Sequence, residues 1–263
     1  MLKIILPVKQ VPEPGAVRID ESTGTVIRKG TESVINPLDL HAVETALRLK
    51  ESCGAHITVI SMGPPAAEKV LREVLALGAD RGVLVSDRAY GGSDTWSTGF
   101  ILSEAIRKAV PDFDLIICGE RATDGDTGQV GCEMGAALGL PVITWVEKVS
   151  CEEKTLRLTR TTDQGSEELL AKLPALIAVT KAAGTPRLPL LSGKIAARKA
   201  EIEVLTQKEL ALDPLCCGLK GSPTRVVKIF HPKLARNGVQ VKGSTRENAE
   251  LLARFLEERE VIL

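Results

Sequence analysis

The chain has 263 residues, and its 34 lysines and arginines balance 34 aspartates and glutamates, so its formal net charge at pH 7 is zero. This balance, with an aromatic content of 3%, argues against a nucleic-acid-binding protein, because such proteins carry a basic excess and stack bases on aromatic side chains. No apolar run approaches membrane-spanning length, and the N-terminus reads as a first strand rather than a signal peptide, so we expect a cytoplasmic protein of one or two domains.

Apolar strands alternate with amphipathic helices through the first half of the chain. We expect strands at residues 2–8, 56–62, 82–86 and 114–118, a hairpin at 17–28, and helices at 37–52, 64–77, 94–110 and 132–138. Asp94 is the expected N-cap of the 94–110 helix. That helix should bury four side chains: Trp96, Phe100, Ile101 and Ile106. Strands that alternate with helices predict a doubly wound, mainly parallel, Rossmann-like α/β sheet.

The pattern changes after residue 141. Four strands, at 142–149, 155–160, 167–172 and 175–180, follow one another without helices, and they should extend the same sheet with antiparallel members. Residues 181–242 are punctuated by Pro and Gly and are expected to form an arm lying on a partner subunit. An amphipathic helix is expected at 245–258, with one apolar face: Leu251, Leu252, Phe255 and Leu256. We therefore expect a nucleotide-binding domain at 1–180 and an arm at 181–263.

Loops rich in Gly, Pro, Ser, Thr or Asp follow the strands of the first half. They span residues 7–17, 36–39, 61–65, 87–98 and 118–131. Ligands of doubly wound sheets bind beyond the carboxyl ends of the strands, where these loops should meet. Five such loops at one edge predict a nucleotide-sized site.

The loop "CGERATDGDTGQVG" (residues 118–131) leads from a strand into a helix, where α/β proteins hold phosphates. Backbone N–H groups at 127–130 would bind an anion. Two polar side chains and two glycines support this reading: Thr127, Gln129, Gly125 and Gly128. Asp124 or Asp126 could cap the helix or accept from a ribose hydroxyl. The alternative is a capped helix with no ligand.

The stretch "DRAYGGSDT" (residues 87–95) faintly resembles the pyrophosphate loop of ATP pyrophosphatases, and its alternative is a capped helix entry. There is no G-x-G-x-x-G after the first strand, no Walker loop and no G-x-S-x-G elbow. The six cysteines read as free thiols, and no Cys/His cluster indicates a metal site. The chain therefore offers a binding site without catalytic residues of its own, so a cofactor would carry any redox chemistry.

Three stretches resemble the β subunit of electron-transfer flavoproteins. They are "VKQVPEPGAVRID" with "NPLDLHAVETALRLK", "SMGPPAAEKVLREVLALGADRGVLVSDRAYGGSDTWST", and "LTRTTDQGSEELLAKLPALIAVTKAAGTPRLPLLSGKIAARKAEIE". Together they span nearly the whole chain. The resemblance implies a parallel α/β domain with an adenine-nucleotide site, paired with an α subunit that carries FAD.

Two segments resemble the electron-bifurcating members of that family, whose β subunit binds a second FAD. Simple carriers, which bind AMP here, lack the Gly-Gly-Ser-Asp-Thr segment at 91–95 and tend to have an extra acid at the position of Gly125. By resemblance, Pro7 and Val8 at the end of the first strand would contact the ligand. Its adenine half would be bound by Asn36, Met62, Gly119, Arg121, Ala122, Asp124, Gly125, Asp126, Thr127, Gly128, Gln129 and Val130. The flavin half would be flanked by Tyr90, Gly91, Gly92, Ser93, Asp94, Thr95 and Thr98.

The loop at 188–199 is similar to the family's recognition loop for partner dehydrogenases. The residues expected to dock are Leu188, Leu191, Lys194, Ile195, Arg198 and Lys199. The alternative is an arm that only holds the α subunit.

The resemblance implies a subunit of an NAD-linked flavoprotein oxidoreductase that is inactive alone. FAD would accept hydride from NADH, and electrons would bifurcate to ferredoxin and, through the α-subunit FAD, to a dehydrogenase. The alternatives are a simple carrier with AMP in the site, a nucleotide sensor without a redox role and, last, an ATP pyrophosphatase.

Overall fold

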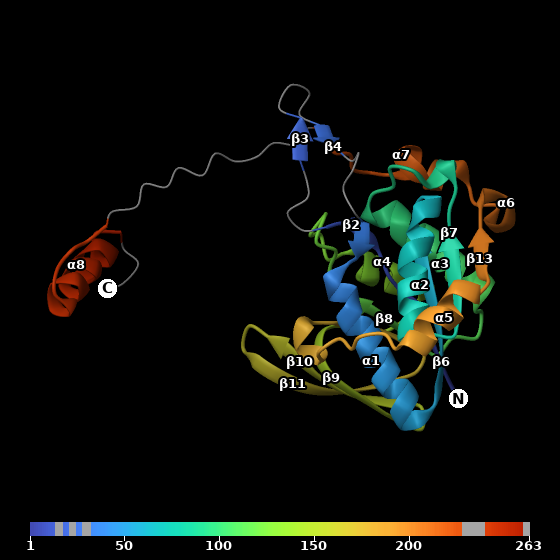
Figure 1. Ribbon diagram of the computed structural model, residues 1–263, viewed down its shortest axis with the longest axis horizontal. Helices are drawn as coiled ribbons and strands as arrows, with labels where there is room; N and C mark the ends of the chain where they lie inside the picture. The colour runs from blue at the N-terminus through green and yellow to red at the C-terminus, as the bar shows by residue number, and fades with distance from the viewer. Residues whose placement is uncertain (14–17, 21–24, 28–32, 228–239, 260–263) are drawn as a thin grey trace. The chain divides into compact units, whose positions relative to one another are not determined.

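The computed structural model describes residues 1–13, 18–20, 25–27, 33–227 and 240–259 of the chain. The chain divides into two compact units, Met1–Lys228 and Ile229–Leu263 (Figure 1). The first unit contains the sheet and its covering helices.

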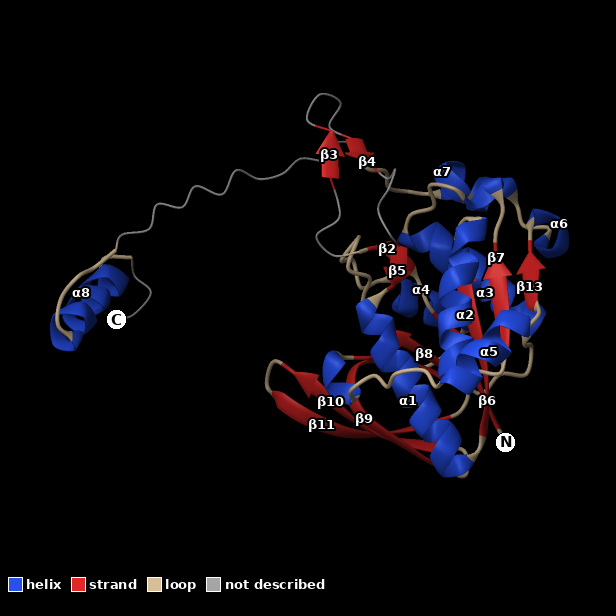
Figure 2. Cartoon of the chain, viewed as in Figure 1, coloured by secondary structure: helices blue, strands red, loops and turns tan. Residues whose placement is uncertain are grey.

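The first unit is built on a sheet of nine strands among the described residues, in the order β11-β10-β9-β12-β8-β1-β6-β7-β13 (Figure 2). The bounds are β1 Leu2–Pro7, β6 Ala55–Met62, β7 Arg81–Val85, β8 Leu115–Gly119, β9 Val142–Glu152, β10 Thr155–Thr162, β11 Gly165–Lys172, β12 Ala175–Val179 and β13 Ile202–Leu205. All neighbours from β9 to β13 in this order are parallel, whereas β10 is antiparallel to both β9 and β11. This confirms an α/β fold with a mainly parallel sheet.

Strand β12 corrects the expectation of an antiparallel extension. It lies between β8 and β9 and is parallel to both, so the antiparallel pairings among the described strands of this sheet are those of β10 with β9 and with β11. All five residues of β12 are buried. Such a strand reads as a continuous apolar run, which does not reveal its direction in the sheet.

Two short antiparallel pairs accompany the sheet. Strand β2 (Gln10–Pro12) pairs with β5 (Ser33–Ile35). Strand β3 (Arg18–Asp20) pairs with β4 (Thr25–Ile27), as predicted for the hairpin at 17–28, whose expected turn at 21–24 lies outside the described residues.

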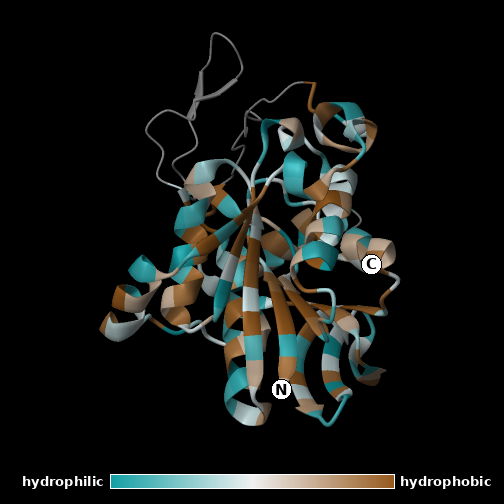
Figure 3. Cartoon of the chain, turned by 90° about the vertical axis from the view of Figure 1, so that its right-hand side faces the viewer, coloured by the Kyte–Doolittle hydropathy of each residue, from teal (hydrophilic) through white to brown (hydrophobic). Residues whose placement is uncertain are grey.

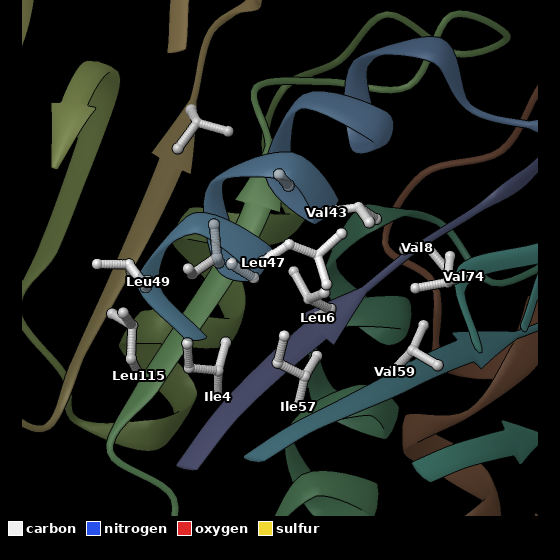
Figure 4. Close-up of a cluster of buried hydrophobic side chains, with 14 of the residues drawn as sticks. Ile4, Leu6, Val8, Val43, Leu47, Leu49, Ile57, Val59, Val74 and Leu115 are labelled. Carbon is white, nitrogen blue, oxygen red and sulfur yellow. The ribbon is translucent and has the colours of Figure 1, made fainter. Parts of the chain in front are cut away.

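Helices cover both faces of the sheet. Their bounds are α1 Pro37–Cys53, α2 Glu68–Leu77 after the 3₁₀ turn η1 Pro65–Ala67, α3 Thr95–Ala109 and α4 Val130–Leu138. Ile4 and Leu6 of β1 pack with α1 and α2 (Figure 4). Ile5 packs with α3 and α4, because successive strand residues point to opposite faces. Hydrophobic residues accordingly run along the central strands (Figure 3). No helix among the described residues is long and apolar enough to cross a membrane.

Trp96 was predicted to be buried in the core, but the structure leaves it exposed. Its side chain is 46% exposed and stacks on the half-buried Phe100, with ring centroids 6.1 Å apart, while Ile101 and Ile106 are buried as expected. Trp96 and Phe100 are four residues apart, so they share a face of α3 that lies beside the one formed by Ile101, Ala105 and Ile106.

Residues 181–227 are packed into the first unit rather than set apart from it. They form η3 Lys181–Ala183, α5 Leu191–Lys199, β13, α6 Gln207–Leu210, η4 Pro214–Cys216 and α7 Gly218–Gly221. Helix α5 packs on α2, and β13 pairs with β7. The boundary between compact units therefore follows Lys228, later than the boundary expected after residue 180. Each of these elements buries too few side chains to give the hydrophobic periodicity from which a helix or strand is predicted, so the sequence did not reveal them.

The second unit contains helix α8 (Thr245–Glu257). Ser244 and Glu247 form a reciprocal capping box at its start, and Arg259 lies over the Phe255 ring at 4.0 Å. The predicted helix at 245–258 is thus present. Within this unit Leu251, Leu252 and Phe255 remain exposed.

Candidate functional site

A cavity of about 1080 Å³ opens at the carboxyl ends of β1, β6, β7 and β8. Residues from all five loops singled out in the sequence line it. Its volume lies just above the usual range for small-molecule sites, roughly 300–1,000 Å³, which suits a nucleotide or dinucleotide.

Most of the predicted binding residues meet in this cavity. Those that line it are Pro7, Val8, Met62, Tyr90, Gly91, Gly92, Ser93, Asp94, Thr95, Thr98, Gly119, Arg121, Ala122, Gly125, Thr127, Gly128, Gln129 and Val130. They come from segments more than 100 residues apart, and the parallel sheet brings them to one edge.

Asn36 does not line the cavity but supports one of its walls. It is 1% exposed, and its Nδ2 donates to the carbonyl of Arg121 at 2.9 Å. Its Oδ1 accepts from the Thr123 N–H at 3.3 Å. Asn36 precedes α1, so it fastens the 118–131 loop to the start of that helix.

Asp124 and Asp126 also lie outside the cavity wall, in ion pairs on its rim. Asp124 pairs with Lys9 and Asp126 with Arg121, each at 2.8 Å. Neither carboxylate caps α4, which corrects the capping alternative: the N-cap is Gln129, without a side-chain hydrogen bond. No side chain of the described residues therefore caps the first N–H groups of α4, and residues 127–131 line the cavity.

Asp39 is a lining residue that the sequence reading did not single out. It lies in the first turn of α1, 6% exposed, and its Oδ2 accepts from the Lys9 N–H at 2.8 Å. Burial raises the pKa of its carboxyl to about 7, although hydrogen bonds from Lys9 and Asn36 oppose the shift. A partly protonated Asp39 weakens the negative charge that a phosphate would meet.

Asp94 caps α3 as predicted, and it has a second role. Its Oδ1 accepts from the Ser97 N–H at 3.0 Å. Its Oδ2 accepts from the N–H and hydroxyl of Thr224 at 2.9 and 2.8 Å, and its own N–H donates to the Ser222 hydroxyl at 2.8 Å. Residues 213–224, hereafter the strap, are thereby held against the 87–98 loop.

The strap also restricts Gly92. A Cβ at Gly92 would lie 2.5 Å from Cγ of Leu219, and φ at Gly92 is +78°. Gly218 donates its N–H to the Ser93 hydroxyl at 3.1 Å. A side chain at Gly92 would thus displace the strap as well as alter the cavity. No local motif in the sequence pairs the strap with the 87–98 loop.

Tyr90 offers an unused polar atom at the cavity. Its ring is 3% exposed, and its buried hydroxyl has no hydrogen-bond partner among the described residues. Burial raises the pKa of this phenol, so it stays protonated and can donate. A buried hydroxyl without a partner beside a cavity indicates a place for a ligand acceptor.

The predicted docking residues lie away from the cavity wall, on and before α5. Residues 191–199, expected as a loop, are helical. Leu188, Leu191 and Ile195 are exposed by 88%, 74% and 51%. Lys194, Arg198 and Lys199 are exposed as well. The structure brings these six side chains to one surface segment, and their docking role stays a prediction.

Comparisons with known proteins agree on one family. The electron transfer flavoprotein domain matches residues 23–210. The chain is 42% identical to an electron transfer flavoprotein subunit beta of Thermoanaerobacterium thermosaccharolyticum, covering 99% of this chain and all of the relative. It is 40% identical to the caffeyl-CoA reductase-Etf complex subunit CarD of Acetobacterium woodii, with the same coverage. It is 37% identical to the acryloyl-CoA reductase electron transfer subunit gamma of Anaerotignum propionicum, again over 99% and 100%.

Proposed function

The chain belongs to the electron transfer flavoprotein family, among its β subunits, and from this premise we propose that its cavity binds FAD in a bifurcating complex. Bound FAD would supply the redox chemistry, taking hydride from NADH and passing electrons to ferredoxin and, through an α-subunit FAD, to a dehydrogenase. The chain's own residues would bind, orient and shield that group. No activity is expected of the subunit alone.

The start of α4 is the observation that carries the proposal. Its N–H groups border the cavity and have no side-chain cap among the described residues, which supports an anion site there that would hold a pyrophosphate. Nothing lies within 4 Å of a Cβ built at Gly125, so this part of the loop leaves room for a phosphate to approach. Asn36 and the two rim ion pairs hold the loop in that shape.

The neighbouring wall, formed by the 87–98 loop and the first turn of α3, would hold the larger ring system. Tyr90, Thr95 and Thr98 line it, and the Tyr90 hydroxyl is available as a donor. A site for AMP alone would leave this wall uncovered, which favours the longer ligand. AMP as a structural ligand of a simple carrier is the alternative outcome.

The charges around the cavity are nearly balanced. Three cations line it, Lys9, Arg88 and Arg121, against four carboxylates, Asp39, Asp87, Asp94 and Glu120. Ligand phosphates would thus be held mainly by backbone donors. The negative charge of the phosphates would then be less neutralised than in a site lined by cations. Because like charges repel, this would disfavour adding further negative charge to the flavin.

The proposed partners are an α subunit, a flavin-dependent dehydrogenase and ferredoxin. Two relatives are named as subunits that serve a caffeyl-CoA or an acryloyl-CoA reductase, which supports a partner that acts on an acyl-CoA. NADH is the proposed electron donor.

Counting the nucleotides released from the denatured heterodimer tests this function. We expect two FAD per heterodimer. One FAD and one AMP would show that the bifurcating assignment is wrong and that the protein is a simple carrier, and an absence of flavin would contradict both.

Two variants should separate the two ends of the cavity. Thr98→Phe adds bulk at the ring end, so the heterodimer should lose one FAD while still binding AMP. Gly125→Val blocks the phosphate loop, so it should weaken FAD and AMP alike. Gly125→Ala is the matched control, since its Cβ meets nothing within 4 Å. Equal loss of AMP binding in Thr98→Phe would contradict this assignment of the two ends.

A further inference from the structure

The chain segment before α5 lies along α1. His41 Nδ1 and the carbonyl oxygen of Gly184 are 2.7 Å apart. Glu44, Arg48 and Glu51 follow at three- and four-residue spacing, and each takes part in contacts with residues 183–187. One face of α1 thus holds this segment over three helical turns.

Arg187 makes the densest set of these contacts. Its Nε donates to Glu44 Oε2 at 2.8 Å, its Nη2 to Glu44 Oε1 at 3.1 Å, and its backbone N–H to Glu44 Oε2 at 3.2 Å. The guanidinium also pairs with both carboxylate oxygens of Glu51. The planar fork of arginine can bridge two carboxylates in this way, whereas a lysine ammonium cannot.

Glu44 is the buried partner, with a side chain only 5% exposed. Burial alone would raise the pKa of its carboxyl, but hydrogen bonds from Arg187 and Arg48 outweigh that effect and hold the pKa below its usual value. Without Arg187 the Glu44 carboxylate would keep Arg48 as its one cationic partner among the described residues.

The other end of the segment is fastened to α2. Arg72 Nη1 donates to the carbonyls of Ala197 and Ala200 at 2.6 and 3.2 Å. Gly193 lies so close to α2 that a Cβ there would be 2.3 Å from the Ala76 carbonyl oxygen. Between these two attachments, Leu188, Leu190 and Leu191 are exposed by 88%, 74% and 74%.

We propose that Arg187 is a positioning residue for docking of the partner dehydrogenase. By bridging Glu44 and Glu51, Arg187 fixes the exposed segment 188–191 between α1 and α2. The dehydrogenase then meets a preorganised apolar surface. The proposal rests on the proposed function, in which a dehydrogenase accepts electrons, and on the docking role predicted for residues 188–199. Fixing the segment before binding removes an ordering cost from association. Arg187 itself need not touch the partner.

The test uses the heterodimer with the α subunit and a purified acyl-CoA dehydrogenase that accepts electrons from the wild type. Arg187→Ala should raise the KM for the dehydrogenase about tenfold, with kcat and NADH oxidation by an artificial dye unchanged. Amide hydrogen exchange at Leu188, Leu190 and Leu191 should become faster. Arg187→Lys should show a KM for the dehydrogenase between those of the wild type and Arg187→Ala. Arg160→Ala, which removes the surface pair with Glu167, is the matched control.

A double variant tests the same proposal without leaving a buried carboxylate short of its cationic partner. Glu44→Gln combined with Arg187→Leu removes the buried charge together with its partner, so the fold should survive while the tether is lost. It should show the same rise in KM. An unchanged KM in both variants, with faster exchange at 188–191, would overturn the proposal.

Leu191→Ala separates this proposal from the docking role on which it rests. If Leu191→Ala raises the KM and the Arg187 variants do not, only the positioning role fails. If Leu191→Ala also leaves the KM unchanged, the docking role itself is wrong.

Discussion

Asp39 shows how one side chain adjusts the charge of the cavity. It is buried at the start of α1 beside Gly119, where a Cβ would lie 2.6 Å from its Oδ1. Its Oδ2 accepts from the backbone N–H of Lys9, while the Lys9 ammonium pairs with Asp124. Because no ammonium or guanidinium bonds directly to it among the described residues, burial dominates and the pKa rises to about 7.

The raised pKa of Asp39 predicts a pH-dependent cost in stability. The unfolded chain ionises this carboxyl near its ordinary pKa of 3.8, and the folded chain does so near 7, so the folding free energy becomes less favourable as pH rises between these values. Asp39→Asn removes the titration. As pH rises from 5 to 8, we expect the free energy of unfolding of the variant to increase by about 2–3 kcal/mol relative to that of the wild type.

Thermal unfolding of the two heterodimers across this pH range measures the effect. The Tm of Asp39→Asn minus that of the wild type should increase with pH and level off above pH 7. Two Tm curves that stay parallel from pH 5 to pH 8 would show that Asp39 is ionised in the folded protein.

Among the elements, the strap joins the cavity loop to a part of the chain more than 100 residues away. Asp94 is its attachment point, through Ser222 and Thr224, while the same carboxylate caps α3 through Ser97. The strap therefore supports the wall formed by residues 90–95.

Removing the strap's attachment should loosen that wall. Ser222→Ala with Thr224→Val deletes the two hydroxyls bonded to Asp94, and we expect a loss of about 1–3 kcal/mol in stability. Amide exchange at 91–94 should become faster, and FAD should dissociate more quickly. Thr161→Val, which deletes an exposed hydroxyl bonded to Glu147, is the control and should change neither. Unchanged exchange at 91–94 in the double variant would contradict a supporting role.

On the scale of the whole molecule, α8 belongs to a compact unit too small to bury its own apolar face. Leu251, Leu252 and Phe255 are 48%, 57% and 43% exposed within it. Exposed apolar surface of this kind marks an interaction site, and the proposed α subunit would cover it.

Placing a charge on this face should weaken the heterodimer. Phe255→Glu should lower association with the α subunit at least tenfold, because a carboxylate would be buried without a partner. Analytical ultracentrifugation over a dilution series measures it. Glu250→Gln, on the same helix, is the control. A Phe255→Glu heterodimer as tight as the wild type would exclude this face from the interface.

The local patterns of the sequence were sufficient for the elements of the α/β region and for the choice of loops. The start of α1 at Pro37, the Asp94 cap and the strands β1, β6, β7 and β8 depend on residues close together in the chain. The meeting of the five loops follows from the parallel sheet, because its strands end at one edge. Their common cavity could therefore be expected before the structure was known.

Contacts between distant residues were decided by the tertiary structure alone. The place of β12 between β8 and β9, the Arg187 bridge to Glu44 and Glu51, and the strap on Asp94 join positions tens to more than 100 residues apart, and they have no local signature. The raised pKa of Asp39 depends on the depth of its burial, which a sequence does not state. Periodicity records which face of an element is buried, but the neighbour that buries it is set by packing of the whole chain.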